Sequence, residues 1–193
     1  MGSRKGVATA GRPLIVSRVP SSLNPSRFMN PAEEIVKFWL QENGYFVQSS
    51  IHVLKGQGRE IDILAIHRKT RKMKHIEVSV GIKMSVFKGD AAAKAAEYSK
   101  KFMNSRIKDE TRRRFGVTGP IKRELVVGDV SIKHKDVLKD FTKVCKKHHI
   151  DVVMFSVILN DVADKLKFEN RLNPIIRTVQ LCKKFLSYQE TRV

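Results

Sequence analysis

The segments Arg59-Glu60-Ile61-Asp62-Ile63-Leu64-Ala65 and His75-Ile76-Glu77-Val78-Ser79-Val80 decide the fold of this chain. Both are short, apolar and rich in β-branched residues, and a basic turn separates them, so they predict a hairpin of two buried strands. Side chains alternate along a strand. A tight hairpin would therefore set Asp62 and Glu77 side by side, and a carboxylate on a buried strand is costly unless something pairs with it.

A hard divalent cation is a natural partner for such carboxylates, because Mg²⁺ prefers oxygen ligands and keeps several waters. We expect Mg²⁺ or Mn²⁺, held by Asp62 and Glu77, with Glu33 near the start of the first predicted helix as a third carboxylate. Solvated or salt-bridged acids are the alternative. The ordered set of three acids favours the metal site over that alternative.

The pattern around this hairpin predicts an α/β fold with a mixed β-sheet flanked by helices. Asn30-Pro31 is typical of a helix start and Asn43-Gly44 of its end. The helix that begins at Asp90 has a predicted inner stripe of Ala91, Ala95, Tyr98 and Phe102. The other predicted elements are strands at 45–54, 61–67, 75–80, 124–127 and 150–159, a basic connector at 104–123, and helices at 136–148 and 175–188.

Composition bounds the function and the organisation of the chain. Of 193 residues, 38 are Lys or Arg and 19 are Asp or Glu, which gives a net charge of +19 and favours a polyanionic partner. No stretch approaches the roughly 20 apolar residues of a spanning helix, so we expect no membrane partner. The two cysteines form no CxxC pair, which excludes a zinc knuckle. We expect a basic arm at 1–29, a core at 30–160 and a helical C-terminal extension at 161–193.

The first 32 residues contain no acid and leave two interpretations open. They form either an arm that lies along phosphates or an organellar transit sequence, which is Arg- and Ser-rich and acid-poor. The first interpretation predicts a cytoplasmic or nucleoid-associated protein, and the second an organellar matrix protein.

Residues 30 to 83 resemble the PD-(D/E)xK nuclease superfamily, in particular archaeal Holliday-junction resolvases and restriction-endonuclease-like proteins. The matching pieces are Ala32-Glu33, Gly44-Tyr45, Gly58-Arg59-Glu60-Ile61-Asp62-Ile63 and Ile76-Glu77-Val78-Ser79. The resemblance implies a restriction-endonuclease-like fold, a homodimer, and metal ligation by Glu33, Asp62 and Glu77.

One departure from the family pattern concerns the motif lysine, whose position holds Ser79. A serine hydroxyl carries no charge and cannot supply the electrostatic role of that lysine. Lys83 could replace it if the chain turns at Gly81, and Lys94 could do so from the following helix. The third possibility is an inactive site on a fold that only binds. His75, on the same strand face as Glu77, is a weaker candidate for a general base.

Two basic runs are candidates for phosphate contact, which gives affinity more than sequence specificity. We place one at a hairpin tip beside the carboxylate site and the other on the connector. Their residues are Arg68, Lys69, Arg71, Lys72, Arg112, Arg113, Arg114, Lys122 and Arg123.

The sequence thus predicts a metal-dependent endonuclease that cleaves branched or structured DNA, with DNA favoured over RNA. The alternative is an inactive nuclease fold that binds DNA or RNA or serves in a nucleoprotein complex. A third hypothesis is a binding module that uses the basic surface without the carboxylates.

Overall fold

The computed structural model of the protein describes residues 30–52, 60–80, 91–103, 105–116, 119–128, 135–166 and 173–190. The predicted arm at 1–29 lies outside these residues. Within them the chain runs through α1 (Pro31–Glu42), β1 (Tyr45–His52), β2 (Glu60–His67), β3 (Met73–Ser79), α2 (Ala91–Met103), α3 (Ser105–Phe115), β4 (Ile121–Val127), α4 (Lys135–Lys147), β5 (Ile150–Met154), α5 (Phe155–Lys165) and α6 (Pro174–Glu190).

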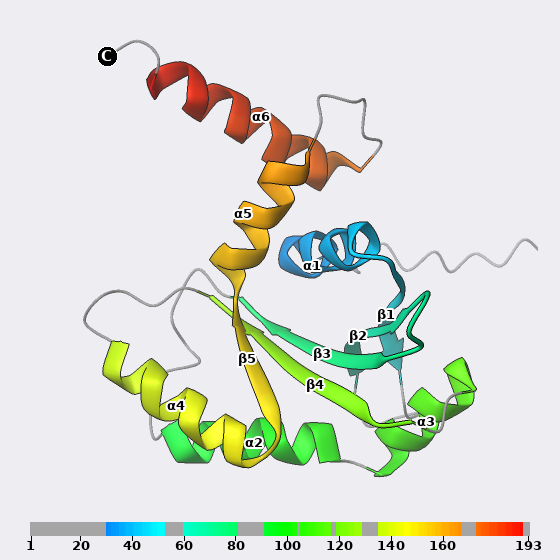
Figure 1. The fold of residues 1–193 in the computed structure, drawn as a ribbon. Helices are drawn as coiled ribbons and strands as arrows, with labels where there is room; N and C mark the ends of the chain where they lie inside the picture. The colour runs from blue at the N-terminus through cyan, green and yellow to red at the C-terminus, as the bar shows by residue number, and fades with distance from the viewer. Residues whose placement is uncertain are drawn as a thin grey trace, which may run out of the picture.

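The strands form one five-stranded mixed sheet in the order β1-β2-β3-β4-β5 (Figure 1). The pairs β1–β2 and β2–β3 are antiparallel, and β3–β4 and β4–β5 are parallel. In the β2–β3 pair, Ile63 lies opposite Ile76 and Leu64 opposite His75. The prediction of an α/β fold with a mixed sheet is confirmed.

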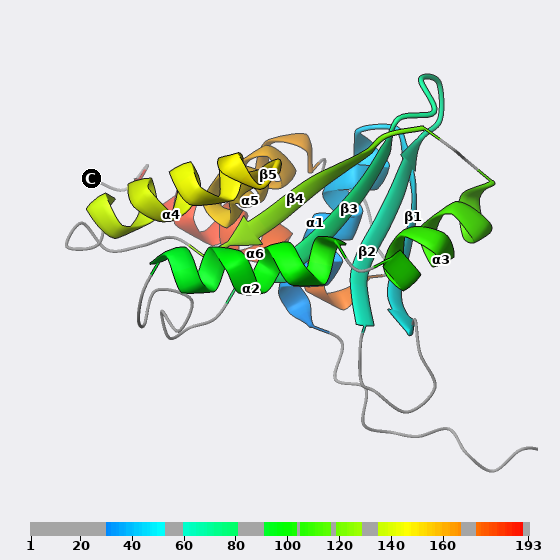
Figure 2. The ribbon, with the colours of Figure 1, turned by 90° about the horizontal axis from the view of Figure 1, so that it is seen from below.

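Helices cover both faces of the sheet, which makes a three-layer arrangement. α1 and α5 lie on one face, with α6 beyond them, while α2 and α4 lie on the other and α3 lies near β2 (Figures 1 and 2). Each face has its own apolar core. Ile35, Ile63 and Ile158 belong to the first, and Ala95, Leu125 and Phe141 to the second.

The start of α1 follows the predicted cap. The Ala32 backbone N–H donates to Asn30 Oδ1 at 3.1 Å, and Pro31 takes the first helical position. This cap fixes where the first turn begins, and the first turn carries Glu33.

Two predictions of local structure were wrong. The basic connector at 104–123 contains the helix α3, in which Ile107 and Thr111, four residues apart, are both buried. The strand predicted at 150–159 ends at Met154, and α5 begins at Phe155. Ile158 and Val162 are buried at helical spacing, and a short apolar run by itself does not distinguish a buried strand from a buried helix.

The C-terminal helices are part of the core. α5 spans the boundary expected at 160/161, and both α5 and α6 contribute to the cluster under α1, through Val162 and Ile176. Of the helices in the described ranges, none is long and apolar enough to span a bilayer.

Candidate active site

Two carboxylates meet on the β2–β3 hairpin. Continuing the register from Ile63–Ile76 by one residue sets Asp62 opposite Glu77. The Val78 backbone N–H donates to Asp62 Oδ2 at 2.8 Å, which ties the Asp62 side chain to β3. The alternation in the sequence therefore placed this pair as it occurs in the fold.

Glu77 is buried and Asp62 is partly buried. Glu77 is 1% exposed. Burial, and then the charge of Glu77, raise the pKa of Asp62 to about 6. Burial likewise raises the pKa of Glu77 to about 7, against the opposing influence of a nearby ammonium group. Paired acids with raised pKa values are a frequent mark of functional sites.

The ammonium group belongs to Lys101, on the last turn of α2. Its Nζ forms an ion pair with Glu77 Oε2 and lies 3.6 Å from Asp62 Oδ1. Burial alone would lower the pKa of Lys101, but the two carboxylates outweigh burial and raise it, so the group stays charged. A lysine from outside the strand motif thus faces both carboxylates.

The path of α2 along β3 selects this lysine. Tyr98 Oη donates to Ser79 Oγ at 2.8 Å, Lys101 contacts Glu77, and the Phe102 ring lies 4.6 Å from the His75 ring. Later residues of α2 therefore contact earlier residues of β3. The axes of α2 and β3 cross at an angle (Figure 2).

Of the two lysines that the sequence nominated, the structure describes Lys94, which pairs with a different acid. Lys94 Nζ pairs with Glu97 Oε2 at 2.8 Å, on the exposed side of α2. It is one turn before Tyr98, which meets Ser79 at the end of β3, and its ion-pair partner in the fold is Glu97, not Asp62 or Glu77. Lys83 lies outside the described residues. Lys101 follows Lys94 by seven residues and borders the same inner stripe, a spacing that could have identified it.

His75 supports Glu77 from within the same strand. Its Nε2 lies 2.7 Å from Glu77 Oε1, and its ring is 2% exposed. Burial, and then the charge of Lys101, lower the pKa of His75 to about 3. A neutral ring with its proton on Nε2 donates to Glu77 and holds that carboxylate in place.

Glu33 approaches the pair from the first turn of α1. Asn30 Nδ2 donates to Glu33 Oε1 at 2.7 Å. Burial, and then the charge of Asp62, raise the pKa of Glu33. The three acids that the sequence nominated are therefore electrostatic neighbours in the fold.

These acids do not by themselves form a complete metal cage. In the ranges that the structure describes, no group of three or more His, Cys, Asp or Glu side chains is arranged to hold an ion. Glu77 Oε2 is fully buried and has no hydrogen bond to a described residue beyond its ion pair with Lys101. Mg²⁺ is often held by one or two carboxylates plus water and substrate phosphate. The donors Asp62 and Glu77 fit that mode of binding.

The basic hairpin tip lies farther from the carboxylates than expected. The pair Ile66–Met73 precedes the turn, and it is about 13 Å along the strands from Asp62–Glu77. Arg68 packs over the exposed Phe46 ring at 4.9 Å. The prediction that this tip adjoins the site was wrong, because both acids stand toward the opposite ends of their strands.

The second basic run divides into paired and unpaired side chains. Arg113 and Arg114 both pair with Glu110 on α3, and Lys122 pairs with Glu124 and Asp151. Arg112 and Arg123 form no ion pair with any residue in the described part of the chain. Both line a cavity next to His75.

The chain matches no family model, no curated protein and no solved structure.

Proposed function

We propose that this protein is a divalent-metal-dependent endonuclease that cleaves DNA, acting on branched or structured DNA. One observation carries the proposal: a buried carboxylate, Glu77, faces a second acid, Asp62, and a lysine ammonium from another element. Metal-dependent hydrolysis of a phosphodiester uses carboxylate ligands for the metal and a cation for the charge that develops on phosphate. The resemblance of residues 30–83 to the PD-(D/E)xK superfamily supports the same chemistry and a restriction-endonuclease-like fold.

Mg²⁺ or Mn²⁺ would be held by Asp62 and Glu77, with Glu33 as a supporting carboxylate. When bound, such an ion neutralises charge on the phosphate and lowers the pKa of bound water. The placement of these two carboxylates side by side, with Asp62 tied to β3 by the Val78 backbone N–H, supports this assignment. The donor oxygens are of the hard type that these ions prefer.

The protein's own groups have separate tasks in this proposal. Lys101 takes the electrostatic role of the lysine that Ser79 replaces, stabilising negative charge on the phosphate. His75 holds Glu77 in a fixed orientation through its 2.7 Å contact. Ser79 itself accepts a hydrogen bond from Tyr98 and contributes to the docking of α2.

A nucleic acid is the proposed polyanion because the chain carries a net charge of +19, and because Arg112 and Arg123, which have no ion-pair partner among the described residues, border the site. The resemblance to resolvases favours DNA over RNA. The resemblance to resolvases further implies a homodimer, in which two sites would act on a two-fold substrate.

A second candidate is an inactive nuclease fold that binds nucleic acid. Lys101 already offsets the charge of Asp62 and Glu77 without a metal, so the site can persist as a structural ion-pair cluster. This candidate shares the basic surface and differs in having no cleavage step.

Cleavage of end-labelled DNA tests the two candidates. Duplex, single-stranded and four-way-junction DNA would be incubated with Mg²⁺ or Mn²⁺ and with wild type, Asp62→Asn or the control Asp140→Asn, an exposed acid on α4. We expect Asp62→Asn to lower the rate at least about 100-fold and Asp140→Asn to leave it unchanged. Cleavage that survives in Asp62→Asn would contradict the site. Salt-sensitive binding without cleavage in all three proteins would establish the second candidate.

A further inference from the structure

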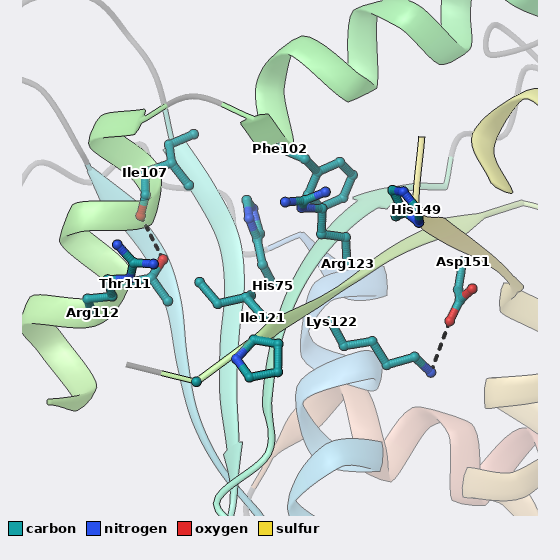
Figure 3. A pocket seen from close by; sticks show the side chains of 12 residues that line it. His75, Phe102, Ile107, Thr111, Arg112, Ile121, Lys122, Arg123, His149 and Asp151 are labelled. Atoms are coloured by element: carbon teal, nitrogen blue, oxygen red, sulfur yellow. Dashed lines mark hydrogen bonds and ion pairs between the residues drawn. The ribbon is translucent and has the colours of Figure 1, made fainter. Parts of the chain in front are cut away.

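A cavity of about 480 Å³ adjoins the candidate site where α2, α3 and the start of β4 meet. Its volume lies in the ~300–1,000 Å³ range of small-ligand sites. Arg112 lies on one side of the hollow, while Arg123 and His149 lie on the other (Figure 3).

The cavity lining holds three cations, Arg112, Lys122 and Arg123, and one anion, Asp151. Arg112 and Arg123 have no ion-pair partner among the described residues. The one lysine in the lining, Lys122, is directed to Asp151 at 3.1 Å (Figure 3). Thr111 adds no free donor, because its hydroxyl donates to the Ile107 carbonyl at 2.7 Å. Two guanidinium groups are therefore available to an anion, and guanidinium suits phosphate through its planar fork of N–H donors.

The remaining lining is apolar and aromatic. Pro120 and Ile121 contribute accessible carbon surface beside the arginines, and the buried Phe102 and Ile107 lie behind it. His149 reaches the cavity from the turn after α4 with φ +58°, a backbone conformation in which Gly or Asn is more usual. A phosphate alone would leave this apolar surface unused, whereas a nucleotide would cover it with its base.

His75 connects the cavity to the carboxylates. His75 lines it, packs against Phe102 at 4.6 Å and contacts Glu77 at 2.7 Å. A nucleotide in the cavity would therefore belong to a nucleic-acid strand that also runs past Asp62 and Glu77.

We propose that this cavity binds one unpaired nucleotide of a nucleic-acid strand, with its phosphate at Arg112 and Arg123 and its base against the apolar wall. The inference rests on the proposed function, because it names what the substrate of that site must contain. A fully stacked duplex does not offer a free base, so the cavity selects substrates with an unpaired or extruded nucleotide.

Metal-free binding tests the inference separately from cleavage. In EDTA and on an Asp62→Asn background, affinities would be measured for a duplex and for the same duplex with one unpaired nucleotide. We expect the unpaired nucleotide to strengthen binding about tenfold. Arg123→Gln and Arg112→Gln should each bring that ratio close to one. The matched control Arg113→Gln, whose arginine pairs with Glu110 on the same helix as Arg112, should keep it.

Other outcomes overturn the inference. A ratio of one in the parent protein, or a tenfold ratio that persists in both pocket variants, would do so. Arg112 is exposed on a helix, so its variant remains informative if Arg123→Gln fails to fold. Tight binding of a free nucleoside monophosphate without discrimination between the duplexes would assign the cavity to a free nucleotide instead. If the protein discriminates between the two duplexes but does not cleave DNA, only the proposed nuclease activity is rejected. If it cleaves DNA without discriminating between them, only the proposed nucleotide site in the cavity is rejected.

Discussion

Glu77 is the residue at which the stability of the fold and the proposed chemistry conflict. Its carboxylate is buried on a central strand, where an isolated charge is unfavourable. His75 and Lys101 offset part of that cost through one contact to each oxygen. A leucine at this position would avoid that cost but would leave His75 and Lys101 without their partner.

The raised pKa of Glu77 predicts a pH-dependent stability for the metal-free protein. Its pKa is about 7 in the fold and near 4.5 in the unfolded chain, so the folded state retains a proton that the unfolded state releases. That stabilisation is complete below about pH 4.5 and is lost as the pH rises through 7. Relative to Glu77→Gln, we expect wild type to lose about 2–3 kcal/mol of unfolding free energy between pH 5 and pH 8.

Urea unfolding in EDTA at several pH values measures this difference. The neutral His75 contributes in the opposite direction, because its lowered pKa destabilises the fold as the pH falls below 6.5, but it is present in both proteins. Parallel curves for the two proteins would show that Glu77 titrates normally.

At the scale of the element, the direction of α2 decides which lysine reaches the carboxylates. α2 meets β3 through Tyr98 near the strand end and through Phe102 farther back. Lys101 lies between these contacts, and Lys94 lies before both of them. Two lysines of similar sequence context therefore have different environments.

Replacing each lysine by methionine separates the two environments. We expect Lys101→Met to lower the rate of metal-dependent cleavage at least about 100-fold, because the cation opposite the phosphate is lost. Lys94→Met removes an exposed pair with Glu97 and should leave the rate unchanged. Near-UV circular dichroism would establish that both variants are folded. Full activity in Lys101→Met, or loss confined to Lys94→Met, would contradict the assignment.

At the scale of the whole molecule, the two ends of the described chain share one core. Ile176 on α6 is fully buried in the cluster that includes Val36 of α1 and Ile158 of α5. Trp39 Nε1 donates to Asp161 Oδ2 at 2.6 Å, and Asn173 Nδ2 donates to Glu34 Oε2 at 3.2 Å. α1, which carries Glu33, is therefore held against the sheet by the C-terminal helices.

This arrangement predicts that α6 stabilises the core. Ile176→Ala should lower the free energy of unfolding by about 2–5 kcal/mol, because it leaves a cavity in a packed cluster. The control Leu181→Ala, on the same helix and 45% exposed, should change it by no more than about 0.5 kcal/mol. Denaturant titration measures both, and equal effects would show that α6 does not pack as described.

How much the sequence predicted depends on the range of each interaction. Alternation on two strands joined by a short turn placed Asp62 beside Glu77, and the Asn30-Pro31 cap placed Glu33 on a first helical turn. These are local properties, because strand parity and helix caps are set by neighbouring residues. Neighbouring residues alone do not determine the structure of the apolar run at 150–159, because packing decides that a strand extends to Met154 and a helix follows it.

The sequence by itself therefore determined the α/β class, the mixed sheet and the acidic residues that the hairpin brings together. Only the tertiary structure decided that Lys101 faces them and that Arg112 and Arg123 line one cavity. Each of these depends on how a helix lies against a strand distant in the sequence. That alignment is set by the packing of whole side-chain surfaces, and helical periodicity shows only which lysines border the inner stripe, not which of them meets Glu77.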